Sequence, residues 1–502
     1  MWYTSILRVS RLIVVALALL WLLLQAPILQ LPYSQEWDST QLALGAEVFD
    51  IHRHQPHPPG YPLWVKTSGF LAPLFGNFLT PQRWLSLAFT LAALASFWLL
   101  VKSLTCPRRA VWIVALLAFT PLVALHAASP LTCAVDLFAS AFTALAIYRV
   151  LQGDARCFVA ACVVLALCAG FRQSGAVFLV PLPLLGATML WRKHRGTLAL
   201  GVALGALASA LWFLPTAIHT GGIAELLELS RHQMRTSAAG TSVFYGASLA
   251  QHFGMLYAFV VFGAFGFGIP VALWSLWFVF SHLTKRETEG GKGSEVESRG
   301  AFPLAGLPPY LGIAFWCAWL IPNLAFLLLV HCAKPGYLLL SLPPLVLLFT
   351  CKLPKRMLAF GVACCLLLSY FPYFALASQL FPESTARRYA FYLERCTPQI
   401  PLHVAAWNTG LIEALQPFRG QQLTGYSYTM AGEAPNARTL NYDCPFVHWK
   451  EAHEDSASET SPALLVTLSH SPVPSQEAKL RGARRLWSDG WVSLWLRPGS
   501  SE

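Results

Sequence analysis

Hydrophobic residues fall into long apolar runs that are separated by short polar stretches. Runs of roughly 18 to 22 residues recur from Leu12 to Ala377, and a helix of that length crosses about 30 Å of hydrocarbon. The pattern predicts an all-α polytopic membrane domain over residues 1–377 with about eleven transmembrane helices. The expected spans lie near residues 12–31, 84–104, 109–128, 131–148, 157–170, 175–190, 197–218, 246–284, 311–330, 338–351 and 357–377.

Lys and Arg cluster at alternate ends of these runs. The clusters are Arg8/Arg11, Arg108/Arg109, Arg149/Arg156, Arg192–Arg195, Lys285/Arg286 and Lys352–Arg356. Basic residues are enriched in cytoplasmic loops, so this alternation predicts that the N-terminus lies inside. The first loop (32–81), the hinge at 171–174, the Gly221–Gly222 loop, Lys334 and the C-terminal tail would then lie outside.

The composition turns polar after the last run. Residues 378–502 contain strand-like runs at 464–468 and 491–496 and a helical stretch at 385–396, which predict a small α/β extracytoplasmic domain. Cys396 and Cys444 lie in this region, on the oxidising side, where a disulfide can persist. The spacing leaves open whether they are bridged.

Overall composition narrows the function classes. The chain is 56% hydrophobic and 12% charged, and its +11 net charge lies at span ends, which indicates topology and membrane-lipid contact rather than a nucleic-acid partner. The twelve Cys residues show no zinc-site spacing, and no nucleotide-phosphate loop is present. The run from Leu12 to Leu24 could be a signal peptide, but the missing small-residue cleavage site favours an uncleaved span.

The first outer loop concentrates the polar chemistry. It holds Asp38, Asp50 and the run His57-Pro58-Pro59-Gly60-Tyr61-Pro62, whose prolines and glycine predict a stiff backbone just above the membrane. The weaker apolar segment 63–79 is expected near the interface. Alternatively, Asp38 is a solvated helix cap and His57 belongs to turn chemistry.

Asp38, the amphipathic stretch after it and the His-Pro-Pro-Gly-Tyr-Pro-Leu run resemble the first external loop of the GT-C superfamily. These membrane glycosyltransferases use polyprenyl-phosphate sugars and include protein O-mannosyltransferases and the aminoarabinose transferases of lipid A. The resemblance extends to the topology of residues 1–377 and does not reach the C-terminal region. It implies that Asp38 acts as the catalytic base or as the group that positions the acceptor.

Further site residues follow from the same resemblance and from the charge of the leaving phosphate. Asp136, at the outer end of a span, is expected to be the second catalytic carboxylate, although a structural Asp bonded to Arg or Ser is the alternative. Arg172 and Lys334 would bind the phosphate, unless they are interfacial anchors. The substrate-binding set is completed by Tyr337, His57, Tyr61 and Asp50.

The predicted function is an inverting glycosyltransferase. It would move a sugar from a polyprenyl-phosphate carrier to a lipid, glycan or protein acceptor at the outer face of a bacterial inner membrane. An O-antigen ligase or polymerase, and a lipid-linked glycan flippase, remain alternatives. A divalent metal is left open, because Asp38, Asp50, His57 and Asp136 could ligate one but show no diagnostic spacing.

Overall fold

The computed structural model describes residues 2–29, 37–238, 241–288, 307–331, 335–367, 424–427, 448–451, 463–468, 483–488 and 492–497. Residues up to 367 form helices, and the last five ranges contain strands. In the first half of the chain the helices are α1 (Trp2–Leu29), α2 (Trp37–Glu47), η1 (Ile51–Arg53), α3 (Pro62–Phe75), α4 (Leu79–Leu104), α5 (Pro107–Phe119), α6 (Pro121–His126), α7 (Cys133–Leu151), α8 (Arg156–Phe171), α9 (Gln173–Leu179), α10 (Pro181–Leu190) and α11 (Arg195–Thr220). They continue with α12 (Ile223–Ala238), η2 (Val243–Tyr245), α13 (Leu249–Ala258), η3 (Phe259–Ala264), α14 (Phe265–Thr288), α15 (Pro309–Leu329), η4 (Pro335–Leu340), α16 (Leu342–Thr350) and α17 (Lys355–Cys365).

Within the described residues, each expected span overlaps a helix or consecutive helices; residues 368–377 of the last expected span lie outside them. Within the described ranges, α4, α7, α11 and α15 are long and apolar enough to cross a membrane, and α9 with α10, bent by 42°, could form a fifth span. Proline at the start of α6 and of α10 explains two of the breaks, because proline lacks the backbone N–H that a continuing helix needs. The number eleven stays a prediction.

Helix α7 forms the centre of the bundle and packs against α4, α8 and α10. The buried hydroxyl group of Ser140 on α7 is bonded to two neighbouring segments, as an apolar interior favours. The Ser140 hydroxyl donates to the carbonyl oxygen of Leu340 at 2.6 Å and accepts from Trp319 Nε1 at 2.8 Å. On α4, the Ser86 hydroxyl contacts the carbonyl oxygens of Ser129 and Leu131, which fixes the turn before α7.

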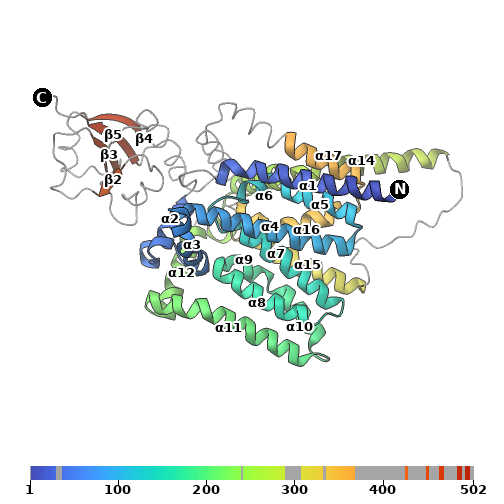
Figure 1. Cartoon of the computed structure of the whole chain (residues 1–502), viewed down its shortest axis with the longest axis horizontal. Coiled ribbons are helices and arrows are strands. Elements are labelled where there is room, and N and C mark those ends of the chain that lie inside the picture. Colours follow the sequence, from blue (N-terminus) through green and yellow to red (C-terminus); the bar gives the residue numbers. More distant parts are fainter. Residues whose placement is uncertain are drawn as a thin grey trace.

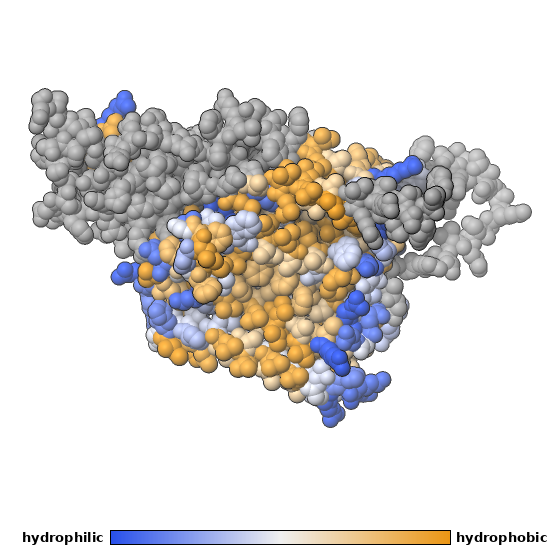
Figure 2. Space-filling model, viewed as in Figure 1, coloured by the Kyte–Doolittle hydropathy of each residue, from blue (hydrophilic) through white to orange (hydrophobic). Residues whose placement is uncertain are grey.

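The surface of the helical bundle is divided by polarity. Figure 2 shows hydrophobic side chains over the middle of the bundle and hydrophilic residues at both of its ends. Large apolar side chains are widely exposed there, among them Leu211, Ile218 and Leu276 at 67–78%. Such a broad apolar surface fits hydrocarbon rather than water as the surrounding solvent.

Helices α2, α3 and α12 gather at one end of the bundle, and the N-terminus lies at the other (Figure 1). Residues Ile223–Ala238, which follow the turn at Gly221 and Gly222, form α12. At the opposite end, Arg109 Nη1 donates to the Cys351 carbonyl at 3.0 Å, so two of the basic clusters meet. Which end faces the cytoplasm stays a prediction.

The C-terminal region contains a mixed five-stranded sheet in the order β2-β1-β3-β5-β4. The strands are β1 (Thr424–Ser427), β2 (His448–Glu451), β3 (Ala463–Leu468), β4 (Arg484–Ser488) and β5 (Val492–Arg497). β1 is parallel to β2 and β3, whereas β5 is antiparallel to β3 and β4. Both expected strands are confirmed as β3 and β5. The expected helix at 385–396, Cys396, Cys444 and the domain boundary at 377 lie outside the described residues.

Candidate active site

The centre of the candidate site is Arg172, which separates α8 from α9. Its backbone is extended, with φ −156° and ψ 104°, so the two helices do not continue through it. This confirms the hinge expected at 171–174. The alternative of a water-reaching interfacial anchor does not fit, because only 7% of Arg172 is exposed.

Three side chains hold the Arg172 guanidinium. Its Nε donates to Asp136 Oδ2 at 2.6 Å, and its Nη1 donates to Thr132 Oγ1 at 2.7 Å. The Tyr337 ring lies 4.8 Å from the guanidinium carbon, within cation–π range. Arginine has five N–H donors, and these bonds use two of them, so the fork keeps donors for an anion.

The first outer loop reaches this centre through Tyr61. Its backbone is left-handed, with φ 44°, and it precedes the first residue of α3. Helix α3 lies so close to α8 that a Cβ on Gly170 would meet a Leu63 methyl at 2.6 Å. Tyr61 is also within electrostatic range of Arg172. A left-handed non-glycine residue is uncommon and is tolerated where the surroundings enforce it.

A hydrogen-bond chain connects Tyr61 to α2. His57 Nδ1 lies 2.8 Å from Gln41 Oε1, and His57 Nε2 lies 3.0 Å from the Tyr61 hydroxyl. Because the amide oxygen accepts, Nδ1 carries the proton, and in a neutral ring Nε2 then accepts from Tyr61. Asp38 lies three residues before Gln41, in the first turn of α2, so both occupy one face of that helix. It is partly exposed.

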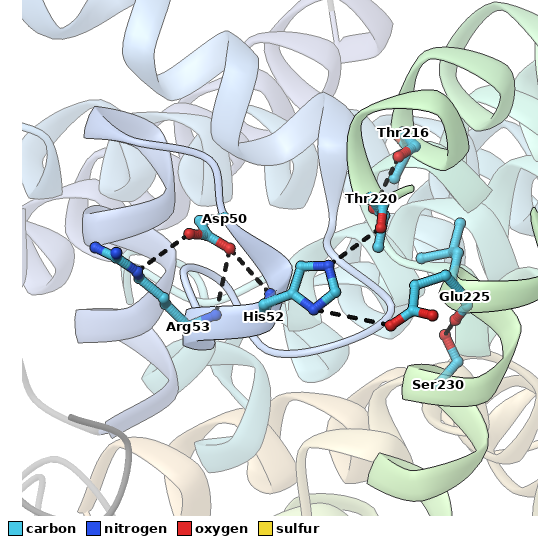
Figure 3. Close-up of polar contacts among 8 residues, drawn as sticks. Asp50, His52, Arg53, Thr216, Thr220, Glu225 and Ser230 are labelled. Atoms are coloured by element: carbon cyan, nitrogen blue, oxygen red, sulfur yellow. Dashed lines mark hydrogen bonds and ion pairs between the residues drawn. The ribbon is translucent and has the colours of Figure 1, made fainter. Parts of the chain in front are cut away.

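Asp50 belongs to a different part of the loop. Its Oδ1 accepts from the backbone N–H groups of His52 and Arg53 at 3.1 and 3.3 Å, and its Oδ2 lies 3.4 Å from Arg53 Nε (Figure 3). These contacts cap η1 and fix the loop. The Arg53 side chain is 74% exposed, as expected of a solvated face.

The loop is fastened to α11 and α12 by histidines. His52 Nε2 donates to the Thr220 carbonyl at 3.1 Å (Figure 3), and His219 Nε2 donates to the Phe49 carbonyl at 2.9 Å. His54 is half-buried here, and its pKa is lowered from the usual value by burial and by the neighbouring His232. His52 Nδ1 also lies 4.0 Å from Glu225 Oε1 on α12 (Figure 3), so the first outer loop, α11 and α12 are joined at this end of the bundle.

The other expected residues are distributed as follows. Lys334 lies outside the described residues, whereas Tyr337 in η4 is anchored through its carbonyl, which accepts from Asn323 Nδ2 at 3.1 Å. Within the described part of the chain, no group of three or more His, Cys, Asp or Glu side chains could hold a metal ion. The sequence did not point to Thr132 or Gln41, because a lone hydroxyl or amide carries no spacing signal.

Comparisons with known proteins support the fold. No family model matches this sequence, and no curated protein matches it either. Among solved structures, the chain is similar to ArnT from Cupriavidus metallidurans bound to undecaprenyl phosphate, with a TM-score of 0.55 and 12% identity over 97% of this chain and 98% of that one. The apo state of the same ArnT gives a TM-score of 0.53 and 12% identity over 96% and 99%.

The first-loop motif and the whole-chain likeness therefore agree. The match covers nearly the whole length of both chains. At this identity the likeness establishes the architecture and leaves the roles of individual residues to their geometry. The chain shares its overall fold with this ArnT.

Proposed function

We propose that this protein is a glycosyltransferase that moves a sugar from a polyprenyl-phosphate carrier to a lipid, glycan or protein acceptor. The observation that carries the proposal is the buried guanidinium of Arg172, held by Asp136, Thr132 and Tyr337 in a fold shared with an ArnT that binds undecaprenyl phosphate. An anionic lipid headgroup is the ligand such a fork suits best.

Arg172 would bind the phosphate of the donor. The Asp136 carboxylate already neutralises one side of the guanidinium. Among the described residues nothing bonds to the remaining donors, which would bind phosphate oxygens in pairs. Asp136 itself is 1% exposed and engaged through Oδ2, so we assign it to holding Arg172 rather than to contact with the acceptor. Lys334 stays a proposed second cation.

Asp38 would be the general base. The acceptor oxygen attacks the anomeric carbon, the bond from that carbon to the phosphate oxygen breaks, and the phosphate leaves with the electron pair. The acceptor proton passes to the Asp38 carboxylate, and direct displacement inverts the anomeric centre. His57 and Tyr61 would fix the loop that presents Asp38, since their bonds connect α2 to α3.

The reaction would take place at the outer face of a bacterial inner membrane. The apolar middle of the bundle suits lipid. Asp38 lies in α2 and Tyr61 directly precedes α3, and these helices lie with α12 at one end of the bundle (Figure 1). The proposed first-loop site at residues 32–81 would therefore open where the headgroups of lipid carriers reside. Residues 378–502 would form an outer α/β domain close to the acceptor.

The test is transfer of radiolabelled sugar by the purified full-length protein in lipid nanodiscs. Synthetic polyprenyl-monophosphate sugars are offered beside a membrane extract as acceptor, with diphosphate-linked oligosaccharides in parallel. Arg172→Ala should abolish transfer and donor binding, whereas Arg192→Ala, an exposed arginine at the opposite end, should leave both unchanged. Transfer from the diphosphate donor alone would favour a ligase or polymerase. Movement of lipid-linked sugar without transfer would favour a flippase.

A further inference from the structure

We propose that Gly175 is a positioning residue for the donor-phosphate site, because its lack of a side chain seats the Asp136 carboxylate that holds Arg172. The inference rests on the proposed function, since it assigns a role within the same site. Gly175 lies in the first turn of α9, three residues after Arg172. Its backbone φ is ordinary, so the need for glycine here is a need for space.

The space at Gly175 is filled by the carboxylate. An added Cβ would lie 1.8 Å from Asp136 Oδ1, 2.7 Å from Cγ and 3.5 Å from Oδ2. No pair of heavy atoms tolerates such a separation without a bond. Asp136 is 1% exposed, so the carboxylate cannot turn outward into solvent. A methyl group at this position must therefore turn the carboxylate or push α9 away from α7.

Either displacement would be transmitted to Arg172. Arg172 Nε donates to Asp136 Oδ2 at 2.6 Å. Gly175 makes room for Oδ1, the other oxygen of the same carboxylate, so a shift of one oxygen also moves the other. Thr132 lies four residues before Asp136, so both face the same side at the start of α7. Together they hold Nε and Nη1 and fix the plane of the guanidinium, which decides where its other donors point.

The unused oxygen of the carboxylate supports this interpretation. Asp136 Oδ1 is buried and makes no hydrogen bond among the residues that the structure describes. Burial of a carboxylate oxygen without a hydrogen-bond donor costs free energy. A side chain at position 175 would place an apolar group directly against this oxygen, whereas glycine does not. The arrangement places the Gly175 Cα, rather than a side chain, against the carboxylate.

The bundle offers a matched control in Gly186 of α10. It also packs toward α7, where an added Cβ would lie 3.0 Å from Ile147 Cδ1 and 3.3 Å from Phe158 Cδ2. These atoms belong to apolar side chains of α7 and α8 rather than to the ion pair. Gly186→Ala thus measures the cost of crowding a neighbouring helix interface of α7, and Gly175→Ala adds displacement of the carboxylate.

The experiment measures polyprenyl-monophosphate affinity and thermal stability of the full chain in nanodiscs. Gly175→Ala should raise the donor Kd at least about tenfold and lower kcat/KM in parallel, whereas Gly186→Ala should change Kd less than about twofold. In an Asp136→Ala background, Gly175→Ala should cause no further loss, since the carboxylate is gone. Equal effects of the two glycine variants, or additivity with Asp136→Ala, would overturn the inference.

A second variant covers the case in which Gly175→Ala does not fold. Thr132→Val removes the hydroxyl acceptor while keeping the side-chain shape, and it should raise the donor Kd several-fold without lowering the melting temperature as far. An unchanged Kd for Thr132→Val would then count against the positioning role. If the unaltered protein neither binds nor uses the polyprenyl-phosphate donor, the proposed function fails instead, which separates the two outcomes.

Discussion

The ion pair between Asp136 and Arg172 makes a prediction about stability that can be worked from its burial. The two residues are 1% and 7% exposed, and their polar atoms are 2.6 Å apart. Removal of one partner leaves an unpaired charge inside the bundle, which costs about 3–5 kcal/mol. An exposed pair would contribute about 0.2–1 kcal/mol, so the two cases are well separated.

A double-mutant cycle isolates the interaction. Asp136→Ala and Arg172→Met should each lower the free energy of unfolding by about 3–5 kcal/mol. The double variant removes both charges, and its loss should be at least about 2 kcal/mol smaller than the sum of the single losses, because no charge is left unpaired. Arg172 also contacts Tyr337 and Thr132, so its single variant should be the more damaging one.

Unfolding can be followed by tryptophan fluorescence as denaturing detergent is added to protein in mixed micelles. Single losses below about 1 kcal/mol would mean that the pair is solvated. Additivity of the two substitutions within about 0.5 kcal/mol would show that the side chains do not interact, and it would refute the reasoning about the site.

Three further predictions concern the first outer loop and the guanidinium. Gly60→Ala should cost about 1–3 kcal/mol and expose the first loop to proteases, because φ is +105° there and a Cβ would meet an isoleucine methyl at 2.7 Å. Burial and His232 lower the pKa of His54 in the folded protein, so as the pH falls the unfolded chain takes up the proton first. The melting temperature should therefore fall as the pH drops below about 6.5, and it should fall less in His54→Gln. Tyr337→Leu should weaken donor binding roughly 2- to 30-fold, whereas Tyr337→Phe should keep the ring contact with Arg172 and bind normally.

Each of these three predictions has a control position elsewhere in the chain. Gly196→Ala meets nothing within 4 Å, His194 is exposed, and Tyr310 is 69% exposed, so their variants should be neutral in the same assays. Protease resistance in Gly60→Ala, an unchanged pH slope in His54→Gln, or normal binding by Tyr337→Leu would each contradict the corresponding contact.

Much of the helical architecture could be predicted from the sequence. Long apolar runs and the basic clusters at their ends reflect the surrounding lipid, and this signal extends over whole segments. Interruptions of the spans were less predictable. The break between α5 and α6 depends on Pro121 within an apolar run, and α12 forms where glycines and charged residues suggested a loop. Helix α12 packs against α11, and its Glu225 lies 4.0 Å from His52 of the first loop; these are tertiary contacts that the local sequence pattern does not carry.

The candidate site divides in the same way. Asp136 and Arg172 were conspicuous because charges are rare in apolar runs, but that they form one pair follows from the antiparallel packing of α7 and α8. Thr132 and Gly175 carry no signal of their own in the sequence. Thr132 matters through its hydrogen bond to Arg172, and Gly175 through its close approach to Asp136. Asp50 stood out in the sequence as an acidic residue. In the structure, both of its carboxylate oxygens contact residues of the same loop, His52 and Arg53.

The most direct test of the central claim is sugar transfer by the Asp38→Asn variant. Purified protein in nanodiscs is given a radiolabelled polyprenyl-monophosphate sugar and a membrane extract, and label in the acceptor fraction is measured. We predict transfer by the unaltered protein and by Asp154→Asn, an exposed carboxylate between α7 and α8, and its loss in Asp38→Asn with donor binding retained. Full transfer by Asp38→Asn would contradict the account.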